Sequence, residues 1–187
     1  MTECMCTPGQ TVGPFLDLGL PYPGDSALAG DDDPRAVRLH GTVYDGAGEG
    51  VPDGLVELWQ PDGAGRVPRQ AGSLRRDATT FTGWGRCATD AAGHYGFTTV
   101  APGAASAGRP PFFALTVFAR GLLDRLFTRA YLPGGDAGAD PLLASLDAER
   151  RATLLCVTQS DCRDYRFDIH LQGPRETVFL AYRGGGR

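Results

Sequence analysis

Apolar and polar residues alternate along several short segments of this chain. In the segment 38–44, Leu39, Gly41 and Val43 fall on one face, and the polar side chains and Tyr44 fall on the other. The segment 165–171 alternates in the same way. A period of two residues is typical of strands that bury one face. With the turn signals between them, these patterns predict strands over 38–44, 55–60, 95–100, 112–120, 125–132, 165–171 and 177–182.

One segment has the pattern of a helix instead. Asp140-Pro141 provides a capping carboxylate followed by proline at the first helical position, and residues 148–152 have high helix propensity. We therefore expect helical structure within 140–155. Short strands with turns between them, together with one or two short helices, predict an all-β protein built as an antiparallel β-sandwich.

The N-terminal residues differ from the rest of the chain. Proline and glycine recur through them, and an acidic run at 31–33 followed by Pro34 closes the segment. We expect residues 1–35 to form an extended arm that contacts a partner chain, and residues 36–187 to form the sandwich domain.

The composition excludes several classes of protein. The 187 residues include 27 glycines and 14 prolines, too many for a bundle of long helices, yet 42% are hydrophobic, enough for a core. No apolar run approaches the ~18 residues of a membrane span. All 18 basic residues are arginine, the net charge is −4, and no basic cluster is present, so we expect neither a membrane nor a nucleic acid as partner.

The five cysteines do not form an extracellular disulfide framework, because their number is odd and no basic and apolar leader precedes them. We expect a cytoplasmic protein with reduced thiols. Cys4 and Cys6 are close together but lack a second pair at zinc-type spacing, so a thiol-bound metal is only the weakest alternative.

Few residues could form a catalytic site within this chain. His40 and His170 fall on polar strand faces and His94 falls in a turn, so no two histidines share a ligand spacing. A Gly-x-Ser-x-Gly nucleophile motif is absent from the sequence. We therefore expect these histidines to be surface or hydrogen-bonding residues, and the chain to hold no catalytic residue of its own.

Two positions are suited to contact a ligand. Arg120 ends the apolar run 112–119, so its guanidinium can emerge at a strand end and bind a carboxylate. An ion pair with Asp124 or another surface acid is the alternative. In the arm, Gly13 permits close approach of a ligand and Pro14 stiffens the backbone, although an ordinary turn would have the same residues.

A set of motifs occurs in consistent order along the chain, at residues 41–45, 55–62, 81–86, 89–90, 93–97, 99–103 and 165–169. Together these motifs resemble the intradiol ring-cleavage dioxygenases. The arm 7–15, the run 118–121 and the ending 176–179 resemble more narrowly the iron-free alpha chain of the two-chain members of that family.

The resemblance implies a β-sandwich and a ferric ion held by two tyrosines and two histidines, where O2 cleaves a catecholate ring. The iron-binding chain carries His-x-His after Arg-Pro, whereas here Arg109-Pro110-Pro111 precedes Phe112-Phe113-Ala114. The sequence also has no tyrosine at 73–94 or 96–130, where the other two ligands are expected. Phenyl and methyl groups offer no lone pair to a metal. We expect no metal ligand in this chain and Fe(III) in a partner beta chain.

The resemblance also implies a partner and a binding role. The partner is an iron-bearing beta subunit, in a hetero-oligomer of such pairs that cleaves 3,4-dihydroxybenzoate with O2. Gly13 and Arg120 match positions that meet the substrate, with Arg120 supplying positive charge, and Thr11 and Pro14 would line the mouth of the pocket. Phe15 departs from the family, where tyrosine is frequent.

An alternative from another class stays open. A stand-alone, transthyretin-like module that binds a small ligand or a protein, without catalysis, would also lack the four metal ligands. It would not account for the segment Thr11–Phe15 or for the neighbours of Arg120.

Overall fold

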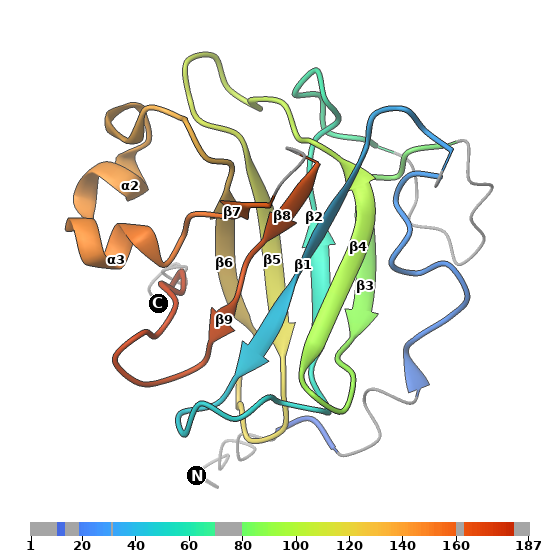
Figure 1. Ribbon diagram of the computed structural model, residues 1–187, viewed down its shortest axis with the longest axis vertical. Helices are drawn as coiled ribbons and strands as arrows, with labels where there is room; N and C mark the ends of the chain where they lie inside the picture. The colour runs from blue at the N-terminus through green and yellow to red at the C-terminus, as the bar shows by residue number, and fades with distance from the viewer. Residues whose placement is uncertain (1–10, 14–18, 31, 70–79, 160–162, 182–187) are drawn as a thin grey trace, which may run out of the picture.

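The computed structural model describes residues 11–13, 19–30, 32–69, 80–159 and 163–181, and two β-sheets packed face to face lie at its centre (Figure 1). The strands are β1 (Ala36–Tyr44), β2 (Leu55–Trp59), β3 (Trp84–Ala88), β4 (His94–Val100), β5 (Phe112–Phe118), β6 (Leu126–Tyr131), β7 (Val157–Thr158), β8 (Asp164–Arg166) and β9 (Ile169–His170). One sheet has the order β4-β1-β8-β7 with β9 also on β1, and the other has the order β3-β2-β5-β6. This architecture confirms the predicted β-sandwich.

The core lies between the two sheets and follows the alternation seen in the sequence. Leu39 and Val43 of β1 are completely buried, as are Val56 and Leu58 of β2. Burial of such side chains contributes roughly 1.5–3 kcal/mol each. The strand pairs within the second sheet are all antiparallel, whereas β1 pairs in parallel with β8 and β9, which the sequence did not predict.

The single strand predicted over 165–171 is wrong, because the ladder is interrupted between β8 and β9. At the interruption the Phe167 carbonyl accepts a hydrogen bond from the buried Tyr95 hydroxyl at 2.6 Å. A Cβ atom at Gly41 would overlap this same carbonyl, so only glycine fits there. The carboxylate of Asp168 accepts from the Thr42 amide at 3.1 Å, in place of a backbone carbonyl. Side chains therefore replace one backbone hydrogen bond of the ladder here, while the Phe167 amide still donates to the His40 carbonyl at 2.8 Å.

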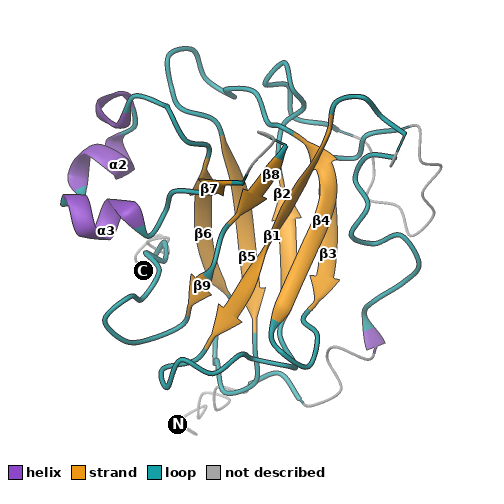
Figure 2. Ribbon diagram, viewed as in Figure 1, coloured by secondary structure: helices purple, strands orange, loops and turns teal. Residues whose placement is uncertain are grey.

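The predicted helix within 140–155 is two short helices, α2 (Pro141–Ser145) and α3 (Ala148–Ala152), beside the sheets (Figure 2). The capping role predicted for Asp140 is confirmed, since its carboxylate accepts from the Leu142 amide at 2.9 Å. Asp147 caps α3 in the same way and so begins a new helix. A short 3₁₀ turn, η1 (Ala137–Ala139), precedes them, and no helix in the described ranges is both long and apolar enough to cross a bilayer.

The strand predicted over 177–182 is also wrong. Residues 177–181 form no ladder, and they are held instead by single contacts such as the Thr128 hydroxyl donating to the Val178 carbonyl at 2.9 Å. Strands β3 and β7 were not predicted. The first contains Gly85, which weakens strand propensity, and the second is only two residues long.

The described part of the N-terminal region lies against the sandwich. Ala27 forms an isolated bridge with Thr98 of β4, and Leu28 is 2% exposed within the main core. The residues just before β1 therefore contribute to the core of this chain. The division at residue 35 between a partner-contacting arm and the sandwich stays a prediction.

Candidate functional site: the turn after β5 and the arm

Arg120 lies in the turn that follows β5, as the apolar run before it predicted. Strands β2 and β5 are antiparallel, with Leu55 opposite Phe118. Extending this register by two residues brings Asp53 opposite Arg120, and the Nη2 atom of Arg120 lies 2.9 Å from Oδ2 of Asp53. The guanidinium has an acidic partner, as the alternative interpretation held, but that partner is Asp53 and not Asp124. The Arg120 side chain stays 60% exposed, so a ligand can reach it.

Thr11 meets the same turn from the far end of the sequence. Its hydroxyl accepts a hydrogen bond from the Gly121 amide at 2.7 Å. Gly121 has a φ of 91°, a conformation that glycine adopts without strain. Two of the residues singled out in the sequence, Thr11 and Arg120, are therefore brought together at one turn.

The structure says less about the other two candidate residues, Gly13 and Pro14. Gly13 is exposed, and an added Cβ would meet no heavy atom of the described residues within 4 Å. Within this chain nothing described requires glycine at that position. Pro14 and Phe15 lie outside the described residues.

The positions expected to hold iron in a metal-bearing relative form an apolar hollow. Phe112 and Ala114 face away from the core on β5 and, with Trp59, Trp84 and Ala105, line a space of about 250 Å³. Within the described ranges no group of three histidine, cysteine or carboxylate side chains could hold a metal ion. The aromatic and methyl groups present at these positions do not fit a ferric ion, because they have no lone pair to donate.

A cationic side chain contacts one of the aromatic rings that line this hollow. The guanidinium of Arg129 lies 4.4 Å from the centre of the Phe112 ring, in a cation–π contact. Trp59, which also lines the hollow, is 53% exposed. Exposed aromatic and arginine side chains of this kind are enriched at protein interfaces.

The three histidines are not brought together at one site. His40 Nε2 lies 2.8 Å from an Asp164 carboxylate oxygen, and His94 lies 3.2 Å from Asp90. His170 stacks on Tyr44 with ring centres 4.8 Å apart, and burial lowers its pKa, with a smaller contribution from a nearby arginine. The expected role of surface or hydrogen-bonding histidine is confirmed for His94, whose exposed ring hydrogen-bonds to Asp90.

The two described cysteines are free thiols. Cys156 is buried, and burial raises its pKa to about 12, so it stays protonated. Burial also raises the pKa of Cys87. Cys4, Cys6 and Cys162 lie outside the described residues.

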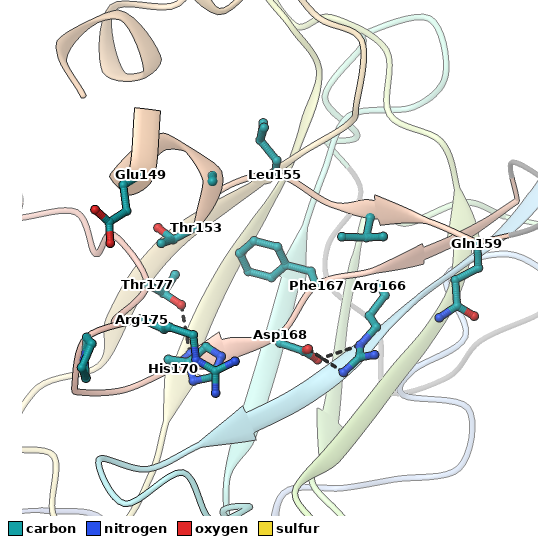
Figure 3. Close-up of a pocket in the computed structure, with 13 residues that line it drawn as sticks. Glu149, Thr153, Leu155, Gln159, Arg166, Phe167, Asp168, His170, Arg175 and Thr177 are labelled. Carbon is teal, nitrogen blue, oxygen red and sulfur yellow. Dashed lines mark hydrogen bonds and ion pairs between the residues drawn. The ribbon is translucent and has the colours of Figure 1, made fainter. Parts of the chain in front are cut away.

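A larger hollow lies on another part of the surface, between α3 and the strands β7 to β9 (Figure 3). It has a volume of about 480 Å³, an apolar floor that includes Leu155 and Phe167, and a polar rim that includes Arg166 and Arg175. Arg166 is held by Asp168 at 2.7 Å. None of the candidate residues Thr11, Gly13 and Arg120 lines it. The sequence gives no signal for this hollow, because its lining residues come from segments that only the fold brings together.

Comparison with known proteins gives a consistent result. Residues 21–173 match the family described as Dioxygenase. The chain is 40% identical to the protocatechuate 3,4-dioxygenase alpha chain of Burkholderia cepacia, with 96% of this chain and 99% of that protein covered. It is 35% identical to the beta chain from the same organism, over 73% of this chain and 64% of the other. The solved dioxygenase domain of a carbohydrate-binding fusion protein from Streptomyces sp. SirexAA-E superimposes with a TM-score of 0.62 at 26% identity, covering 89% of this chain and 98% of that domain.

Proposed function

The chain belongs to the intradiol ring-cleavage dioxygenases, and on that premise we propose that it is the iron-free alpha subunit of a protocatechuate 3,4-dioxygenase. The observation that carries this proposal is the similarity to an alpha chain along almost its whole length. The apolar side chains of Phe112 and Ala114 support it, because they cannot replace imidazole ligands.

In this proposal the metal belongs to the partner. A beta subunit holds Fe(III), which supplies the activation of the catecholate for reaction with O2. The overall reaction converts 3,4-dihydroxybenzoate and O2 to 3-carboxy-cis,cis-muconate. The alpha chain binds no metal, and it completes the substrate pocket of the beta subunit.

In this proposal, residues of the alpha chain bind the substrate and orient it. Arg120 presents a half-exposed guanidinium that can pair with the substrate carboxylate, and such charge-assisted pairs are short and strong. Thr11 ties the arm to the Arg120 turn through the Gly121 amide, which supports a place for Gly13 at the same pocket mouth. The resemblance alone adds Pro14 to that mouth. We also propose a cytoplasmic location, because Cys87 and Cys156 are free thiols, the form that reducing compartments maintain.

Reconstitution tests the proposed function. The alpha chain, the beta chain and the two co-expressed chains are each supplied with protocatechuate, and oxygen uptake is recorded. We expect rapid uptake from the pair and none from the alpha chain alone. Oxygen uptake by the alpha chain alone would overturn the proposal, and failure to associate with any iron-bearing chain would favour the stand-alone binding module.

A further inference from the structure

Asp53 forms an ion pair with Arg120, and the pairing of β2 with β5 brings the two residues together. Extended by two residues beyond the ends of β2 and β5, their register places the two side chains opposite each other, and the ion pair joins them there. Opposite charges on directly facing residues attract, and the contact is stronger where a partner is shielded from water. The Asp53 side chain is only 19% exposed, compared with 60% for Arg120. Asp53 is thus the fixed member of the pair, and Arg120 the one that a ligand can reach.

The backbone that carries Asp53 is itself locked. The hydroxyl of Thr89, a residue 6% exposed, accepts from the Gly54 amide at 2.9 Å and donates to the Val51 carbonyl at 2.7 Å. The Thr89 amide also donates to the Gly54 carbonyl at 2.9 Å. One buried side chain therefore fixes the turn 51–54 from both sides, and with it the position of the Asp53 carboxylate.

The ion pair leaves part of the guanidinium available. It joins Nη2 of Arg120 to Oδ2 of Asp53, and among the described residues neither Nε nor Nη1 has an ion-pair partner. An arginine has five N–H donors in a planar fork, so one edge can be held while another binds a second carboxylate. An arginine oriented beforehand loses less side-chain entropy when it binds a ligand.

We propose that Asp53 is a positioning residue, which orients Arg120 toward the carboxylate of the aromatic substrate. The proposal rests on the function proposed above. In this role, Asp53 strengthens the binding of catechols that carry a carboxylate, and it does not affect the ring-cleavage step. Its negative charge would by itself repel the substrate, so a net gain in affinity requires that orientation outweighs repulsion.

The test uses the co-expressed pair with Asp53→Ala in the alpha chain, and compares protocatechuate with catechol, which lacks the carboxylate. We expect KM for protocatechuate to rise about 3- to 5-fold with kcat changed less than about 2-fold, the upper part of the range for an exposed charge pair. KM for catechol should stay within about 2-fold. Asp53→Asn keeps an oxygen that can accept from Arg120, and it should stay closer to the wild type than Asp53→Ala.

Two controls separate this role from a structural one. Asp124→Ala removes an equal charge from an exposed residue of the turn between β5 and β6, and it should leave both KM values within about 2-fold. The double variant Asp53→Ala, Arg120→Ala should bind protocatechuate no more weakly than Arg120→Ala alone, because the two residues would act as one unit. Iron content and elution volume show whether each variant assembles. If Asp53→Ala does not assemble, Asp53→Asn replaces it: a KM for protocatechuate above that of Asp124→Asn supports the proposal, and an equal KM overturns it.

The outcomes distinguish a failure of the proposed function from a failure of the role given to Asp53. An inactive wild-type pair overturns the proposed function. An active pair whose Asp53→Ala variant keeps the wild-type KM for protocatechuate overturns the role of Asp53 alone. A lowered KM also overturns it and shows that repulsion outweighs orientation. Equal losses for both substrates also overturn it and indicate a structural residue.

Discussion

Thr89→Val is expected to destabilise the chain, because it removes the hydroxyl that fixes the turn 51–54 while keeping the size of the side chain. Two hydrogen bonds are lost, to the Gly54 amide and the Val51 carbonyl. Each is worth about 1 kcal/mol, and a buried amide left without a partner costs about 1–3 kcal/mol. Gly54 is buried, so the expected loss in the free energy of unfolding is about 2–4 kcal/mol. For a chain of this length this lowers Tm by roughly 5–15 °C.

Thr89→Ser is the matched control for this change. It keeps the hydroxyl and both hydrogen bonds and removes only one buried methyl group, which costs about 1 kcal/mol. Urea and thermal unfolding of the full-length chain, followed by tryptophan fluorescence, compare the variants. The account of this turn is refuted if the valine variant is as stable as the serine variant.

Three further predictions address the interrupted ladder, the ligand-facing arginine and the buried thiol. Gly41→Ala should abolish soluble expression or cost more than about 3 kcal/mol, because its Cβ would overlap the Phe167 carbonyl; near-wild-type Tm would disprove the close approach. Arg120→Ala in the assembled enzyme should raise KM for protocatechuate by about 10-fold or more, equivalent to about 1.4 kcal/mol, with a much smaller effect on catechol. Steady-state oxygen uptake measures both, and equal losses would indicate a structural arginine. Cys156, whose pKa is about 12, should resist iodoacetamide at pH 8 until the chain is unfolded in urea, and mass spectrometry showing native labelling would contradict this.

The sandwich could be predicted because its strands bury one face. Leu39 and Val43 have the period of two that a half-buried strand requires, and both are buried as expected. The interruption at Phe167 could not be predicted, because it depends on Tyr95 and Gly41, which meet it only in the folded chain. The two helices in place of one depend on Asp147, whose capping role competes with continuation of the helix.

The candidate site was predicted in part. Arg120 was found from its place at the end of an apolar run, and Thr11 from the resemblance of the arm to the family's alpha chains. Their meeting at Gly121 is a long-range contact that no local pattern contains. The choice of Asp53 over Asp124 depends on the register of β2 and β5, since proximity in sequence favours Asp124. The sequence pattern does not define which residues of two non-consecutive strands lie opposite each other, so the partner of Arg120 could not be predicted.

The central claim is that this chain completes the pocket of an iron-bearing partner and binds no iron itself. The most direct measurement is the iron content of a tagged alpha chain, purified alone and after co-expression with a beta chain, related to the amount of each chain by mass spectrometry. The account predicts negligible iron in the lone alpha chain and one iron per alpha–beta pair. Stoichiometric iron in the lone alpha chain, or two irons per pair, would contradict it.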